Sequence, residues 1–71
     1  MYLTKVEPDA NQYRFYSMEI VPGLFGEWGL IREWGRLGRG GQMRTDWFES
    51  EADAKDARFD IHMKKAKRGY E

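Results

Sequence analysis

The sequence predicts an α+β fold in which a single antiparallel β-sheet of about four strands packs against one C-terminal α-helix. Three observations predict this fold. Apolar and polar residues alternate in short runs over residues 1–48, turn residues separate these runs, and a helical pattern follows a capping serine at Ser50. The 71 residues are enough for one small domain, so we expect residues 1–71 to form a single unit.

Each expected strand ends at a turn signal. The expected strands cover residues 1–7, 13–21, 27–36 and 42–48. Pro8 stops the first strand, and Pro22 with Gly23 stops the second. The glycines after the third strand, at positions 38, 40 and 41, are interpreted as turn residues. Alternation in the second strand divides its residues between two faces, with Tyr16, Met18 and Ile20 on one and Phe15 and Ser17 on the other.

The remaining large apolar side chains are expected to complete a small core. Leu24 and Phe25 form an apolar loop that we expect to be tucked against this core. Trp28 and Trp47 are interpreted as core residues, because a tryptophan in so small a domain more often supplies buried area than a ligand contact.

The helix is expected from Glu51 to about Arg68. Ser50 is suited to cap its N-terminus, and Gly69 supplies a C-terminal stop. Two apolar stripes lie on roughly opposite sides of this helix: Ala54, Ala57 and Ile61 form one, and Ala52, Phe59, Met63 and Ala66 form the other. One sheet can bury only one stripe. The other stripe is either covered by a loop such as Leu24–Phe25 or is an interaction surface.

Charge is arranged in blocks, although the formal net charge is +0. Residues 32–44 and 61–71 are basic, whereas residues 1–31 and 45–60 are acidic. A localised basic patch can bind polyanions at neutral pI, because salt screens distant charges. The basic block at the helix end bears on binding if it lies beside Trp34.

The composition argues against several other classes of protein. The chain has no cysteine and one histidine, and it shows no metal-ligand spacing. We therefore expect no metal, no cofactor and no enzymatic activity. No stretch is apolar enough to span a membrane, and the N-terminus lacks a secretory signal. A cytoplasmic protein without a membrane partner is expected.

The run Trp34-Gly35-Arg36 offers the most chemistry in the sequence. Residues two apart in a strand point to one face, so Arg32, Trp34 and Arg36 are expected to share a surface. An indole ring can stack there on a sugar or base while a guanidinium neutralises a phosphate. Neighbouring glycines let backbone N–H groups approach a phosphate. Strand periodicity also places Trp34 beside Trp28, so burial in the core is the competing interpretation.

The chain resembles the WGR domain, which is named for its Trp-Gly-Arg motif. Residues along nearly the whole chain carry the resemblance: Arg14-Phe15-Tyr16, Trp28, Arg32 to Arg36, Gly38, Gly41-Gln42, Phe48, Ala54, Lys65 and Lys67 to Tyr70. The WGR domain occurs in DNA-damage-dependent poly(ADP-ribose) polymerases and in many small bacterial proteins, and the segment before Trp28 is similar to the standalone bacterial branch. The resemblance implies an antiparallel sheet backed by one helix. The catalytic and zinc-finger parts of the polymerases have no counterpart here, so their activity is not implied.

The resemblance also implies roles for the motif residues. In the polymerases the motif Trp packs on a terminal sugar near a DNA strand break, and the motif Arg helps bind the backbone and a neighbouring domain. Trp34 and Arg36 take these positions here. Our hypothesis is a non-catalytic module that binds DNA or another nucleic acid at ends or backbone without sequence preference. The expected nucleic-acid contacts are Trp34, Gly35, Arg36, Arg39, Arg44, Arg32 and Lys65.

Two alternatives stay open at this point. The protein could be an interaction module that docks a protein partner, or a second copy of itself, through Phe59, Met63 and Ala66. Arg36 could also pair with an acidic residue such as Glu33 or Glu49, and an exposed pair of that kind contributes little.

Overall fold

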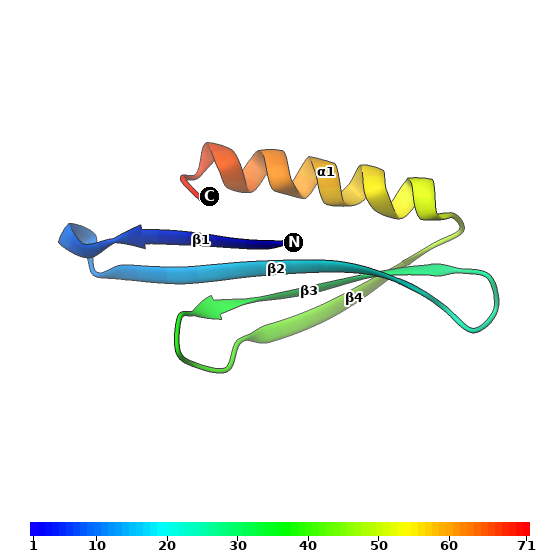
Figure 1. Ribbon diagram of the computed structural model, residues 1–71, viewed down its shortest axis with the longest axis horizontal. Helices are drawn as coiled ribbons and strands as arrows, with labels where there is room; N and C mark the ends of the chain where they lie inside the picture. Colours follow the sequence, from blue (N-terminus) through cyan, green and yellow to red (C-terminus); the bar gives the residue numbers. More distant parts are fainter.

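The computed structural model describes residues 1–71 and contains a four-stranded antiparallel sheet and one long helix (Figure 1). The elements are β1 (Tyr2–Glu7), a 3-10 turn (Pro8–Ala10), β2 (Gln12–Pro22), β3 (Trp28–Arg36), β4 (Gln42–Phe48) and α1 (Glu51–Lys67). The strands lie in the order β1-β2-β3-β4, so each one pairs with its neighbour in the sequence. The predicted α+β fold, with one sheet and one C-terminal helix, is confirmed.

Local chemistry explains where the strands stop. Asn11 ends the first turn in the left-handed conformation, with φ of 53°, which asparagine tolerates better than most residues. Pro22 is the last residue of β2, and the next backbone N–H, that of Gly23, donates to the Glu27 carbonyl at 2.7 Å and closes the hairpin. Gly26, with φ of 86°, completes the β2–β3 turn in a conformation that favours glycine.

Both ends of α1 follow the predicted signals. The Ser50 hydroxyl accepts a hydrogen bond from the Asp53 backbone N–H at 3.1 Å, so the predicted N-cap is confirmed. Gly69, with φ of 95°, turns the chain back after the helix. Thr4 and Glu71 then exchange two backbone hydrogen bonds of 2.8 Å, at the middle of the outer edge of β1. No helix in the structure is long and apolar enough to cross a membrane.

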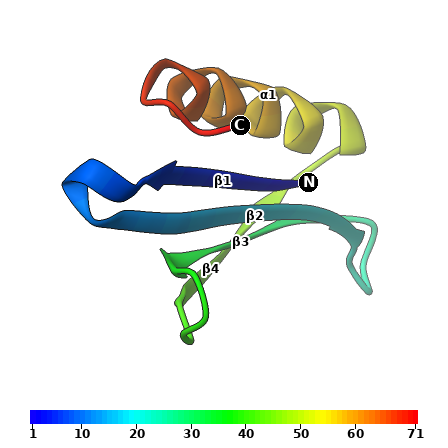
Figure 2. The same cartoon turned by 60° about the vertical axis from the view of Figure 1, so that its left-hand side comes forward.

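The helix covers one face of the sheet and leaves the other face open (Figures 1 and 2). The buried side chains between the two layers include Leu3, Tyr16, Met18, Leu30 and Ala54. Ala57 and Ile61 pack against this cluster, so the stripe that begins at Ala54 is the one that faces the sheet. The other helix stripe is exposed.

Two expectations about apolar residues are wrong. Leu24 and Phe25 are 92% and 90% exposed at the tip of the β2–β3 hairpin, which projects away from α1 (Figure 1). Pairing continues to Pro22 and Trp28, so the turn lies beyond the layers and cannot reach the core. This loop therefore does not cover the outer stripe of α1.

Trp47 is also not a core residue. It is 58% exposed on the open face of the sheet, where its ring lies over Gly29, its partner on β3. A Cβ atom at Gly29 would approach the ring to 3.0 Å, so the absent side chain makes room for the indole. A single helix covers only one face, which leaves Trp47 in solvent. Trp28 is half-buried on the helix side of the sheet, opposite Phe48.

Candidate nucleic-acid interface

Strand register assembles the candidate site at one end of the sheet. Arg14 pairs with Arg36 and Tyr16 pairs with Trp34 across β2 and β3, so the four side chains share the face that α1 covers. Lys65, near the end of α1, reaches the same place. We call Arg14, Trp34, Arg36 and Lys65 the basic end.

Trp34 is held by Tyr16. The two rings are nearly parallel, with centroids 5.8 Å apart and planes 18° from each other. The partner of Trp34 on its other side is Gln42, which is exposed at the start of β4. Trp34 is therefore half-buried and packs against the core on one side. This position is intermediate between the two interpretations made from the sequence, a ligand contact and a core residue.

Lys65 joins the basic block of the helix to that of the sheet. Its ammonium lies 4.5 Å from the centroid of the Tyr16 ring and 5.4 Å from that of Tyr70. Burial lowers the pKa of Lys65, and the positive charges of Arg68, Arg32 and Arg14 lower that pKa further. Lys65 and Trp34 both contact Tyr16. The basic end of the helix therefore lies beside Trp34, as a role in binding requires.

Arg14 and Arg36 have no acidic partner. Both are exposed, and neither forms a salt bridge. The guanidinium of Arg36 instead lies 5.6 Å from the centroid of the Tyr13 ring. The alternative that Arg36 pairs with Glu33 or Glu49 is wrong.

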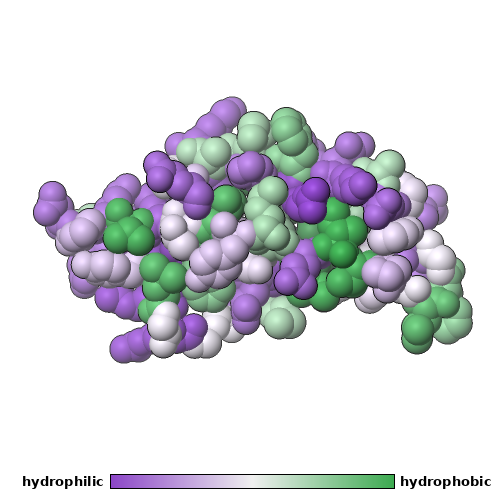
Figure 3. Space-filling model, viewed as in Figure 1, coloured by the Kyte–Doolittle hydropathy of each residue, from purple (hydrophilic) through white to green (hydrophobic).

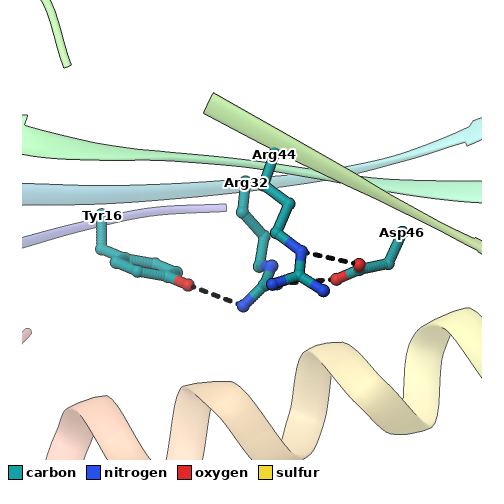
Figure 4. A network of polar contacts seen from close by, with 4 residues as sticks. All are labelled: Tyr16, Arg32, Arg44 and Asp46. Atoms are coloured by element: carbon teal, nitrogen blue, oxygen red, sulfur yellow. Dashed lines mark hydrogen bonds and ion pairs between the residues drawn. The ribbon is translucent and has the colours of Figure 1, made fainter. Parts of the chain in front are cut away.

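Arg32 and Arg44 form a second facing pair of arginines, and this pair does have an acid (Figure 4). Arg32 Nη2 donates to Asp46 Oδ2 at 2.7 Å, and Arg44 Nε donates to Asp46 Oδ1 at 3.0 Å. Arg32 Nη1 also donates to the Tyr16 hydroxyl at 3.4 Å. Burial lowers the pKa of Arg32, but Tyr16 and Asp46 outweigh that effect and hold the pKa above its ordinary value.

The two arginines of this second pair differ in what they can still reach. The Arg32 side chain is 18% exposed, so most of it is committed between the sheet and the helix. The Arg44 side chain is 66% exposed and keeps both terminal nitrogens free of protein partners, since its one hydrogen bond uses Nε. Of the two predicted contacts, Arg44 is the one available to a ligand.

Gly35 faces the opposite side of the sheet from its two motif neighbours. A Cβ atom there would lie 2.9 Å from the Cα of Gly41 and 3.5 Å from the ring of Phe15. Phe15 is buried over this pair of glycines and stacks on Tyr2 with centroids 5.9 Å apart. The structure therefore gives Gly35 a packing function on the open face.

Arg39 lies in the β3–β4 turn, next to the basic end. Its backbone N–H donates to the Arg36 carbonyl at 3.1 Å, while its side chain is exposed and forms no salt bridge. The structure contains no pocket and no cluster of His, Asp and Glu that could hold a metal ion, so the candidate site lies on open surface.

Arg14 is the site residue that sequence reasoning missed. One signal could have found it. The second hairpin has its turn centred near Phe25, and counting outward by equal steps brings Arg14 opposite Arg36. Alternation alone places Arg14 on the face of Tyr16 but not beside the Trp-Gly-Arg run.

Comparison with known proteins gives a family and a curated relative. The sequence model of the WGR domain matches residues 1–71. A Sinorhizobium fredii protein with the name "Uncharacterized protein y4dW" is 43% identical over 70 residues, which is 99% of this chain and 34% of that protein. The chain thus spans about a third of the length of this relative. No solved structure matches the chain significantly.

Proposed function

This chain belongs to the WGR domain family, and from that premise we propose that its basic end binds the backbone and ends of DNA without reading base sequence. Membership of the family suggests a nucleic-acid-binding module in general terms. The proposal goes further in naming the surface and the residues: Arg14, Arg36 and Lys65 would contact phosphates, with Arg39 and Arg44 beside them, and Trp34 would stack on a sugar or base.

The observation that carries the proposal is the contrast between the two facing arginine pairs. Like charges directly opposite each other in a sheet are destabilising. Arg32 and Arg44 share Asp46, so the fold itself supplies their counter-charge. Arg14 and Arg36 lie opposite each other with no such acid. A phosphate group bound between Arg14 and Arg36 would supply the negative charge that Asp46 supplies to Arg32 and Arg44.

Lys65 adds a third cation to the same place. Its lowered pKa reflects burial and the neighbouring arginines, so the ammonium is held where positive charge is already in excess. A bound phosphate would offset both effects by offering a partner of opposite charge. Charge-assisted contacts of this kind release counterions from DNA, so the affinity should fall steeply with added salt.

Trp34 supplies the part of the contact that does not depend on salt. The ring is held in place by Tyr16, and stacking on an aromatic contributes about 1–3 kcal/mol per base by alanine substitution. Neither a stacked ring nor a guanidinium on a phosphate distinguishes the base pairs by their edges. We therefore expect little sequence preference.

The experiment is a binding titration by fluorescence anisotropy at two salt concentrations. The probes are a short labelled duplex with free ends and a nicked duplex, and closed circular DNA competes as a substrate without ends. The Arg14→Ala and Arg36→Ala variants should bind more weakly than the unmodified chain. Arg58→Ala is the matched control, because Arg58 also forms no salt bridge but lies midway along α1.

Three results are informative. Weaker binding by the two basic-end variants, with Arg58→Ala unchanged, supports the proposal. Competition by closed circular DNA as strong as that by linear DNA would assign binding to the backbone and reject a role for ends. Equal binding by all four proteins, or none up to high micromolar concentration, rejects the proposed function.

A further inference from the structure

The outer stripe of α1 is an apolar surface that no other part of the chain covers. We define it as Ala52, Phe59, Met63 and Ala66. Phe59 and Met63 at its centre are 59% and 39% exposed, and both alanines are exposed. The stripe extends for roughly 21 Å at 1.5 Å per residue and points away from the sheet. In the view of Figure 3, apolar and hydrophilic groups alternate along the outer side of α1.

Charge is divided between the two halves of this helix. The first half is acidic and the second is basic, with Glu51, Asp53, Asp56 and Asp60 in one and Lys64, Lys65, Lys67 and Arg68 in the other. At about 100° per residue, three of these lie on one flank of the outer stripe: Asp56, Asp60 and Lys67. None of the three forms a salt bridge within the chain.

We infer that the outer stripe binds a second copy of this chain, with the two α1 helices antiparallel. Reversing one helix against the other places Phe59 beside Met63 of the second copy, near a twofold axis. The acidic half of each helix then lies along the basic half of the other. Asp56 then faces Lys67 of the second copy. In a parallel pair Asp56 could not meet Lys67, because the two residues lie about 16 Å apart along the helix axis.

The other flank of the stripe does not oppose this arrangement. Lys55 lies there, and Glu51 of the same helix already holds its ammonium at 3.6 Å. The buried stripe, which begins at Ala54, faces the sheet, so the body of each domain lies on the far side of its helix from the contact. The interface is self-complementary, as a twofold contact between identical chains requires.

This inference does not depend on nucleic-acid binding. Trp34 and Arg36 belong to the sheet layer and not to the outer side of α1. Loss of the dimer should therefore leave contact with DNA at a single basic end unaffected, and loss of DNA binding should leave the dimer intact.

Sedimentation equilibrium over a series of protein concentrations tests the apolar centre. The unmodified chain should show a monomer–dimer equilibrium, and Phe59→Glu should abolish it. Phe25→Glu is the matched control, because Phe25 is 90% exposed at a hairpin tip away from α1. Both phenylalanines lie largely in solvent, so both variants should retain the fold, which circular dichroism checks.

A charge exchange tests the orientation. Asp56→Lys and Lys67→Asp should each weaken dimerisation about tenfold, since each turns two attractive pairs into repulsive ones. The double variant, Asp56→Lys with Lys67→Asp, restores opposite charges only in the antiparallel dimer and should recover the original affinity. Asp9→Lys, in the 3-10 turn and not on α1, controls for the altered net charge.

Other outcomes overturn the inference. A chain that stays monomeric at millimolar concentration has no dimer of this kind. Association that Phe59→Glu leaves unchanged, or that Phe25→Glu disrupts equally, belongs to another surface. A double variant that fails to recover the affinity rejects the antiparallel arrangement.

Discussion

Arg14 and Arg36 face each other across β2 and β3, and neither forms a salt bridge with any acidic side chain. The next facing pair along the sheet, Arg32 with Arg44, shares one carboxylate at Asp46. The same sheet face thus holds one arginine pair that shares an acid and one pair that has none. This difference separates Arg32, which is committed to Asp46 and Tyr16, from Arg14 and Arg36, which have no acidic partner.

Removing one arginine of the free pair should separate stability from binding. We expect Arg14→Ala to leave the free energy of unfolding unchanged or slightly higher, because it removes a like-charge contact. The same variant should weaken DNA binding and reduce the slope of log affinity against log salt by about 1 for one lost phosphate contact. Denaturant unfolding and anisotropy measure the two effects. Arg32→Ala should show the reverse pattern, since it removes the partner of Asp46 and Tyr16.

The two tryptophans on opposite faces provide a second comparison. Trp34→Ala should weaken DNA binding by about 1–3 kcal/mol through lost stacking, and it should also lower stability because the ring packs on Tyr16. Trp47→Ala removes an equally large side chain from the open face and should leave DNA binding unchanged. Titration of the same labelled duplex with both variants decides between the faces. Equal losses of affinity would place the contact elsewhere.

A methyl group at Gly35 should affect the fold more than the ligand contact. The added Cβ would meet the Cα of Gly41 at 2.9 Å, so the two strands must move apart, at a cost of roughly 1–3 kcal/mol. Thermal unfolding of Gly35→Ala measures this loss. Gly40→Ala is the control, because a Cβ at Gly40 meets open space. A Gly35→Ala variant as stable as the unmodified chain would contradict the close approach seen between the strands.

The pKa of Lys65 leads to a prediction about pH. Burial and then Arg68, Arg32 and Arg14 lower this pKa in the folded state, so the unfolded chain binds a proton there more tightly. Below the folded-state pKa of Lys65, the charged ammonium destabilises the folded state. This destabilisation disappears as the pH rises from the folded-state pKa to the ordinary pKa of lysine. Relative to Lys65→Gln, the unmodified chain should gain stability across this alkaline window.

The measurement is denaturant unfolding of both proteins from neutral to alkaline pH. Only the difference between them reports on Lys65, because other groups titrate in the same range. DNA binding should change in the opposite sense, since the ammonium that contacts phosphate is lost as pH rises. A stability difference that stays constant with pH would show that the two states bind the Lys65 proton equally.

The strands and the helix could be predicted because their signals are local. Pro22 ends β2, Ser50 caps α1, and alternation assigned Tyr16 and Phe15 to opposite faces correctly. These features depend on backbone geometry within a few residues. The helix stripe that begins at Ala54 could be recognised as apolar but could not be distinguished from the outer stripe, because both have helical spacing.

The misplaced residues depend on contacts between elements. Leu24, Phe25 and Trp47 are apolar, yet they lie where neither layer covers them. Their exposure follows from where a hairpin tip projects and from the single helix covering one face, which composition does not encode. Arg14 was missed for the same reason, since its significance depends on the residue opposite it in the next strand.

The hydrogen bonds between Thr4 and Glu71 have a consequence for how the sheet can grow. They occupy the outward-facing backbone groups of Thr4, in the middle of β1, so another strand cannot pair along the whole of that edge, whereas β4 keeps its outer row of backbone groups free. Two domains could join their sheets through β4, and the joined sheet would then end on both sides in a β1 edge that is interrupted at Thr4. Further edge-to-edge addition through β1 would have to displace Glu71 from Thr4, so this contact hinders growth of the sheet beyond two chains.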